Sequence, residues 1–239
     1  MQGNRVKEVL VLGVFLFAGF AVLGYLLGSS AMRIKQFERT VTVKGLAEKE
    51  APADVAVWPI QFTAAGNDLV ALYAALERDT AKIIRFLGDS GFDEPEISVA
   101  APSITDKMAQ QYGNGERAEL RYTALQVVTV YTGKPDAVRR AMNRLVELGK
   151  QGIVFSGGGY QGSTQYLFTG LNELKPEMIE DATRKAREVA EKFARDSDSR
   201  LGKIKSAQQG QFTISDRDSS TPYIKNIRVV STVEYYLSD

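Results

Sequence analysis

The hydrophobic pattern of the chain changes character near residue 32. Val9 to Leu27 is an almost unbroken run of apolar residues and glycine, and no charged side chain occurs from Val9 to Met32. A helix rises about 1.5 Å per residue and a bilayer core is about 30 Å thick, so a helical run of this length can span a membrane. From Arg33 onward, polar and apolar residues follow the periods of strands and helices.

The apolar run has two interpretations. Arg5 and Lys7 precede it, and Ser29-Ser30-Ala31 offers a cleavage site, as in a secretory signal peptide. The run is longer than the core of about 7–15 residues that cleaved signals have, which favours an uncleaved signal-anchor. We therefore predict that residues 9–31 hold the protein in a bilayer and that the large domain is exported. Cleavage after Ala31 is the alternative, and the flanking charges do not decide the orientation.

Periodicity predicts the elements of the exported part. Residues 54–63 alternate, with Ala56, Trp58, Ile60 and Phe62 on one face, and Pro59 predicts an edge strand or a bulge there. The stretch 45–53 is expected to be a charged turn region. Further strands are predicted at 40–44, 97–104, 120–131, 153–155, 166–169, 203–214 and 223–237. Helices are predicted after Asn67, from Pro135 and from Pro176, the last with an apolar stripe of Met178, Ala182, Ala186, Val189 and Phe193.

The order of these elements is ββαββ followed by αββαββ. Strands that neighbour each other in sequence, grouped with helices, predict an α+β fold. We expect an N-terminal transmembrane helix followed by two similar subdomains of mainly antiparallel sheet packed with helices. The expected parts are 1–32 (cytoplasmic tail and transmembrane signal-anchor), 33–133 (first subdomain, ββαββ) and 134–239 (second subdomain, αββαββ).

The composition removes several classes of chemistry. The chain has 30 basic and 29 acidic residues, a balance that argues against general nucleic-acid binding. It has no cysteine and no histidine, which excludes a Cys nucleophile, a Ser-His-Asp triad, a structural zinc site and a haem ligated by His. Catalysis would need carboxylates, Lys, Tyr or Ser, or a metal with oxygen ligands. We expect no enzyme, and neither catalytic, cofactor-binding nor metal-binding residues.

Loop-like segments of two kinds, one glycine-rich and one acidic, are candidate binding sites. The glycines at 157, 158 and 159 lie in the most glycine-rich stretch, but no Gly-Lys-Ser/Thr follows them, so tight turns or an oligomer contact are expected rather than phosphate binding. Short-spaced carboxylates could offer oxygen ligands to Ca²⁺, but they lack the glycine and the distal glutamate of an EF-hand and predict solvated loops. These carboxylates are Asp196, Asp198, Asp216 and Asp218.

Arginines and aromatic residues are the other candidates. Arg139, Arg140 and Arg144 place positive charge on one side of the helix from Pro135. A solvated face is favoured there over binding of an anionic lipid or another acidic surface. Four aromatic side chains could stack on sugars or on a partner, and packing in a core or an interface explains them at least as well. They are Trp58, Tyr160, Tyr166 and Phe168.

Several segments, taken in order, resemble one known family. They are Val41–Gly45 with Glu48 and Pro52–Asp54, then Ile97–Ile104, Tyr122–Tyr131, the Ala-rich stretch 181–194 and Leu201–Ile204. These segments are similar to the motifs of the SIMPL-domain (DUF541) family of bacterial envelope proteins, which includes a Brucella periplasmic immunogen. The resemblance covers about residues 39–238. Leu46 or Ala47 stands where the family's second glycine is usual, and the glycines at 157–159 are an insertion. The resemblance implies an envelope location, an α+β fold and ring-like homo-oligomers, but no catalytic residues.

These observations lead to one expected function and two alternatives. We expect a single-pass protein of the bacterial inner membrane whose main domain lies in the periplasm and self-assembles into a homo-oligomeric ring or scaffold. A link to envelope stress protection is implied by the resemblance alone. The first alternative is a module that binds an envelope ligand such as a glycan, peptide or lipid, and the second is a hydrolase that uses carboxylates or lysine. A concave pocket lined by aromatic residues would favour the binding module, and a flat self-complementary surface the scaffold.

Overall fold

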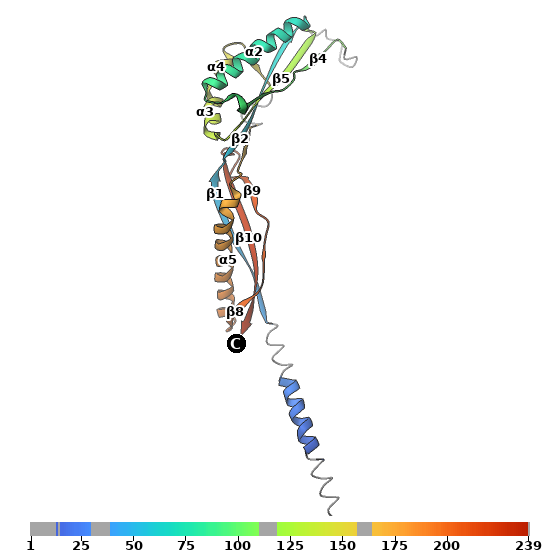
Figure 1. The fold of residues 1–239 in the computed structure, drawn as a ribbon, viewed down its shortest axis with the longest axis vertical. Helices are drawn as coiled ribbons and strands as arrows, with labels where there is room; N and C mark the ends of the chain where they lie inside the picture. Colours follow the sequence, from blue (N-terminus) through green and yellow to red (C-terminus); the bar gives the residue numbers. More distant parts are fainter. Residues whose placement is uncertain (1–12, 14, 30–38, 110–118, 157–163, 239) are drawn as a thin grey trace, which may run out of the picture. The chain divides into compact units, whose positions relative to one another are not determined.

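The computed structural model describes residues 13, 15–29, 39–109, 119–156 and 164–238 (Figure 1). The fold is α+β with antiparallel sheets, as predicted. The chain forms two compact units, each built from segments that are not consecutive. Unit 1 comprises Met1–Glu48, Lys175–Thr213 and Arg228–Asp239, and unit 2 comprises Lys49–Leu174 and Ile214–Ile227.

Residues 15–29 of the apolar run are helical. Across the ranges that the structure describes, we find no helix that combines the length and the hydropathy needed to cross a bilayer. Residues 9–12, 14, 30 and 31 of the expected anchor lie outside the described residues, and with them most of the alternative cleavage site. The transmembrane helix therefore stays a prediction.

Unit 1 is a sheet with a long helix on one face. The sheet has the order β1 (Thr40–Pro52), β10 (Ile224–Ser238), β8 (Arg200–Gln209), and β9 (Thr213–Asp216) also pairs with β10. Helix α5 (Leu171–Asp196) lies along β1 and β10 (Figure 1). One face of β10, the strand predicted at 223–237, is buried. Its residues are each at most 4 % exposed: Ile227, Val229, Ser231, Val233 and Tyr235.

The turn predicted at 45–53 is wrong, because β1 continues to Pro52. Val43, Gly45 and Ala47 keep the two-residue alternation and are buried. Glycine and alanine contribute little hydrophobicity, so the strand period was not visible beside the charged residues between them. A similar error affects 203–214, where one predicted strand is two strands, β8 and β9.

The apolar stripe of α5 is narrower than predicted. Met178, Ala182 and Ala186 are buried as expected, but Val189 and Phe193 are 40 % and 56 % exposed. The helix also begins at Leu171 rather than at the predicted Pro176, which lies inside it. The stripe instead continues in small side chains, Ala190 and Ala194.

Gly45 explains why small residues occupy this stripe. A Cβ atom at Gly45 would lie 1.8 Å from the Ala182 carbonyl oxygen and 2.5 Å from the Ala186 nitrogen. The backbone of β1 therefore approaches the backbone of α5 directly, and a large side chain has no room between them. Val189 and Phe193 remain outside this contact.

Unit 2 is a second antiparallel sheet. Its order is β3 (Ile97–Val99), β5 (Tyr122–Thr132), β2 (Val55–Gly66), β6 (Val154–Phe155), with β4 (Ser103–Asp106) also on β5 and β7 (Gln165–Leu167) also on β2. Its core is shared with helices α2 (Leu69–Asp89), α3 (Pro135–Arg144) and α4 (Val146–Gly149), and a 3-10 turn (Glu94–Glu96) precedes β3. The stretch 97–104, predicted as one strand, is therefore divided between β3 and β4. The position 133/134, at which the sequence was divided into subdomains, lies within unit 2 because β6 and β7 join the same sheet as β5.

The buried face of β2 is confirmed, but its edge position is wrong. Ala56, Trp58, Ile60 and Phe62 are at most 3 % exposed. β2 pairs with β5 on one side and with β7 and then β6 on the other. The Gln61 carbonyl accepts from the Ser156 amide on the β6 side, and residues two apart in a strand point the same way. The nitrogen of Pro59 thus faces the part of this side of β2 that lies between the residues paired with β7 and those paired with β6. No backbone N–H donor is needed there.

Candidate functional site

The glycines at 157–159 and Tyr160 lie outside the described residues. The four predicted loop carboxylates belong to different units, Asp196 and Asp198 to unit 1 and Asp216 and Asp218 to unit 2. The described part of the chain holds no group of three or more acidic side chains that could bind a metal ion. Asp216 pairs with the buried Lys225. Asp218 accepts hydrogen bonds from the Ser220 and Thr221 amides at 2.7 and 2.8 Å.

The Asp218 carboxylate serves to close its own loop. The hydroxyl of Thr221 and the guanidinium of Arg217 also donate to it. These donors, the Thr221 hydroxyl first, lower the pKa of Asp218 from 3.8 to about 2. A carboxylate with this many internal partners is a turn cap, in line with the predicted solvated loop.

Two of the predicted aromatic candidates have packing roles. Trp58 is 1 % exposed and meets Phe92 edge-on at 6.4 Å between ring centroids. The Phe168 ring lies against Gly170, at 3.2 Å from where a Cβ would stand. The Trp58 ring therefore offers no free face to a ligand, and Phe168 is half-buried.

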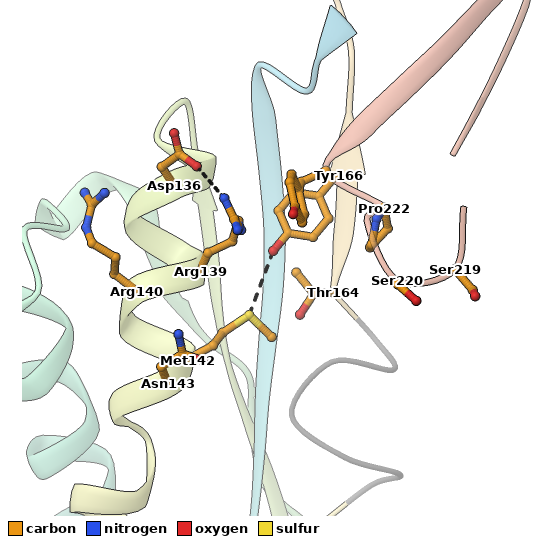
Figure 2. Close-up of a pocket in the computed structure, with 11 residues that line it drawn as sticks. Asp136, Arg139, Arg140, Met142, Asn143, Thr164, Tyr166, Ser219, Ser220 and Pro222 are labelled. Carbon is orange, nitrogen blue, oxygen red and sulfur yellow. Dashed lines mark hydrogen bonds and ion pairs between the residues drawn. The ribbon is translucent and has the colours of Figure 1, made fainter. Parts of the chain in front are cut away.

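The remaining candidates include three that line one cavity within unit 2. Arg139, Arg140 and Tyr166 contribute to a pocket of about 370 Å³, a volume within the usual range for small-molecule sites (Figure 2). Helix α3 forms one wall, with Asp136, Met142 and Asn143 beside the two arginines. The opposite wall comes from β7 and from the connection between β9 and β10, and it holds Thr164, Tyr166, Ser219, Ser220, Pro222 and Tyr223.

The sequence of α3 explains why its polar face lines the cavity. Val138, Ala141 and Leu145 are at most 2 % exposed and turn into the core. Residues 136 and 140 are four apart, as are 139 and 143, and the four together occupy another face of the helix. On β7, Tyr166 alternates with two exposed neighbours and points inward. Tyr223 is held in place because its carbonyl accepts from the Ala53 amide at 2.8 Å.

Arg139 is the centre of the contacts in this cavity. Its Nη1 donates to Asp136 Oδ1 at 3.0 Å, and its Cζ lies 3.7 Å from the centroid of the Tyr223 ring (Figure 2). Tyr223 in turn meets Tyr166 edge-on, with the centroids 6.1 Å apart and the planes at 72°. The guanidinium is therefore stacked on an aromatic face that a second aromatic ring supports.

Two hydroxyl groups in the cavity have weak partners or none. The Tyr166 hydroxyl donates to the Met142 sulfur at 3.9 Å (Figure 2), and a thioether is a weak acceptor. Burial raises the pKa of Tyr166 above its usual 10, while the charge of Arg139 opposes the increase. Thr164 Oγ1 is buried and has no hydrogen-bond partner within the described ranges. Both groups are thus polar atoms without a strong hydrogen-bond partner among the described residues.

Arg144, the third predicted arginine, is separate from the cavity. It forms an ion pair with Glu147 at 3.2 Å and lies over the Phe86 ring, with Cζ 5.5 Å from the centroid. The sequence places it with the other two arginines because all three lie on the same helix. The structure separates it from them because its side chain turns to Glu147 and the Phe86 ring, although it lies only four residues from Arg140.

Sequence reasoning identified three of the eleven residues that line the cavity, Arg139, Arg140 and Tyr166. Tyr223 and the two serines come from a connection far along the chain from α3, and no local pattern links them to it. From the sequence, Asp136 is expected only to begin a helix together with Pro135. A signal that could have pointed to the site was the pairing of Arg139 with an acidic residue three positions earlier.

One family match covers all of unit 2 and most of the sheet and helix of unit 1. The family model described as SIMPL, a protein of unknown function (DUF541), matches residues 41–235. The chain belongs to the SIMPL (DUF541) family. The resemblance found in the sequence motifs is thereby confirmed, and the match includes every residue that lines the cavity. Comparison with curated proteins finds no match, so the likeness to the Brucella immunogen stays a prediction.

Proposed function

We propose that this SIMPL protein is a membrane-anchored binding module of the bacterial envelope, whose main domain takes up a small ligand in the periplasm. The observation that carries the proposal is the cavity of about 370 Å³, in which Tyr166, Tyr223 and Arg139 converge from separate segments. Sites for small ligands are typically concave, with aromatic walls and a few placed polar groups. The role is binding rather than catalysis, a proposal supported by the lack of Cys and His in the chain.

Blocking the cavity tests this function. Ser219 lines the cavity from an exposed loop, so Ser219→Trp should fill the space without disturbing the core. Ser103→Trp, at another exposed serine, is the matched control. The full chain in detergent is probed with benzoate, phenyl phosphate and benzamide by saturation-transfer NMR.

We expect at least one probe to bind the unmodified protein and the Ser103→Trp variant, and to lose its signal with Ser219→Trp. Signals that are equal in all three proteins, or absent from all three, would overturn the binding proposal. Circular dichroism of each variant verifies that the fold is retained.

The location is proposed from the sequence of the apolar run. We infer that residues 9–31 stay in the inner membrane and that the remaining chain is exported. Protease added outside spheroplasts should then digest the main domain, while an N-terminal fragment stays with the membrane fraction. Full protection of the domain would contradict export, and a soluble mature chain that begins after Ala31 would contradict retention.

A homo-oligomeric scaffold is the second candidate function. Val189 and Phe193 are four residues apart on α5, share one helical face, and are 40 % and 56 % exposed. Exposed apolar side chains on one face can form a contact between copies of a chain. A part in envelope stress protection is proposed on the family resemblance alone.

Light scattering on the full chain in detergent tests the scaffold. We expect a protein mass that is a multiple of 26.3 kDa, reduced by Phe193→Asp. Val146→Asp is the control, because Val146 is also 56 % exposed but lies on α4. A single-chain mass for the unmodified protein would rule out the scaffold.

A further inference from the structure

We propose that the ligand of this cavity carries an oxyanion, a carboxylate or a phosphate group, which the guanidinium of Arg139 binds. The inference rests on the proposed function, since it names the chemistry of the ligand that the cavity takes. It is carried by the geometry of Arg139, by the balance of charge around the cavity, and by hydroxyl groups that lack strong partners.

The guanidinium of Arg139 is fixed in place but keeps most of its donors free. A guanidinium has five N–H donors in one plane. Within the described residues, Arg139 donates one hydrogen bond, to Asp136, while its face lies on the Tyr223 ring. Stacking fixes the plane of the group, and the unused donors at its edge form the fork that carboxylate and phosphate oxygens fit.

Charge around the cavity also favours an anion. The titratable groups among its described lining residues are one carboxylate, two guanidinium groups and two phenols. The side chain of Asp136 is 77 % exposed and that of Arg139 is 43 % exposed, so water screens the carboxylate more than the guanidinium. Arg140 adds a second positive charge from the next position of α3 and has no ion-pair partner within the described part of the chain.

The remaining groups of the cavity fit the body of a small acid. Figure 2 shows Arg139 extending from α3 toward Tyr166, with the Tyr166 hydroxyl above the Met142 sulfur and Thr164 close by. Among the described residues the buried Thr164 hydroxyl has no hydrogen-bond partner, and a buried hydroxyl without one is costly. Met142 and Pro222 add apolar surface. A small molecule with one anionic group and a partly apolar body matches this set.

Arg144, on the same helix, is an arginine whose guanidinium already donates two hydrogen bonds to one carboxylate. Its Nε and Nη2 both donate to the carboxylate of Glu147, each at 3.2 Å, and it too lies over an aromatic ring. Arg139 also has a carboxylate and an aromatic ring as partners, but it donates only one hydrogen bond to the carboxylate among the described residues. Arg144→Gln is therefore a matched control for Arg139→Gln: both remove one positive charge, one ion pair and one cation–π contact, and only one faces the cavity.

The experiment compares matched probes on the full chain in detergent. Benzoate and benzamide have nearly the same shape but differ in charge, and phenyl phosphate replaces the carboxylate by a phosphate. We expect benzoate or phenyl phosphate to bind at least about tenfold more tightly than benzamide, the effect of one charged hydrogen bond. Whichever acid binds more tightly identifies the group that the cavity recognises.

The variants then assign the effect to residues. Arg139→Gln should remove the preference for the acids, Arg139→Lys should retain part of it, and Arg144→Gln should leave it unchanged. Asp136→Asn should strengthen binding of the acids several-fold, because it removes the competing carboxylate. A gain in affinity cannot result from a loss of folding, so this variant keeps the test valid if Arg139→Gln is unstable.

Each outcome separates this inference from the proposed function. Equal binding of benzamide and benzoate, blocked by Ser219→Trp and insensitive to Arg139→Gln, would overturn the oxyanion inference and leave the binding function standing. Weaker binding of the acids to Asp136→Asn would also overturn it. No binding of any probe to the unmodified protein would overturn both.

Discussion

Replacing Gly45 by alanine tests the direct contact between β1 and α5 in unit 1. The added methyl carbon would lie 1.8 Å from the Ala182 oxygen, 2.5 Å from the Ala186 nitrogen and 2.9 Å from the Ala182 carbonyl carbon. Non-bonded carbon contacts are optimal at about 3.5–4.0 Å. To bring these contacts to that distance, the helix must move away from the strand by more than about an ångström.

The cost follows from what the methyl group meets. All three neighbours are backbone atoms, which cannot change rotamer to make room. We expect the free energy of unfolding to fall by about 3 kcal/mol, the upper end of the usual range for overpacked cores. For a chain of this size, such a loss lowers the melting temperature by about 6–12 °C.

Gly88→Ala is the control with the opposite sign. Gly88 lies in α2, is exposed, and has no atom within 4 Å of the position its Cβ would take. Alanine there should raise stability by up to about 0.5–1 kcal/mol, because glycine is the weaker helix former. The two variants make the same chemical change in different surroundings.

Urea denaturation of the full chain in mild detergent measures both effects. Far-UV circular dichroism follows the helices, and fluorescence of Trp58, the one tryptophan of the sequence, reports on the core of unit 2. We expect Gly45→Ala to shift the dichroism transition to lower urea. A transition that is unchanged, or shifted upward as in Gly88→Ala, would refute the close packing of α5 on β1.

Two further predictions concern carboxylates that bind backbone amides. Asp54 accepts from the Thr169 amide at 2.8 Å, the Thr169 hydroxyl at 2.9 Å and the Gly170 amide at 2.9 Å, so Asp54→Ala should lower the free energy of unfolding in urea by about 1–3 kcal/mol; a change below about 0.5 kcal/mol would contradict this role. Because the pKa of Asp218 is lowered from 3.8 to about 2, its ionised form stabilises the fold above pH 3.8 and this contribution is lost as the pH falls toward 2. Denaturation of Asp218→Asn across this interval should show its stability deficit shrinking as the pH falls, and a deficit that is constant with pH would argue against the linkage.

Strong alternation was sufficient to predict the elements whose buried residues are large. Trp58, Ile60 and Phe62 on β2 are buried as predicted, because each side chain removes much apolar surface from water and only one register buries them all. Prediction failed where the buried residues are small. Gly45 and Ala47 add little to the hydrophobic pattern, so the sequence predicts a turn where the strand in fact continues.

The candidate site shows a similar division. The positive face of α3 was visible in the sequence, since Arg139 and Arg140 stand opposite the apolar positions of a predicted helix. The use of that face depends on Tyr166 and Tyr223, which reach it from other segments. A helix period describes one element at a time, so it cannot show which distant side chain meets a given arginine.

The sequence alone determined the class of the fold, the family, and the chemistry that is excluded. Local periodicity, the order of the motifs and the lack of Cys and His can all be recognised without knowing which residues are in contact. Tertiary structure alone decided which residues meet. It brought Ala182 and Ala186 against Gly45, and it placed Tyr223 under Arg139. Such contacts depend on the close approach of segments that are distant in sequence, and the space left between those segments decides both what packs and what can bind.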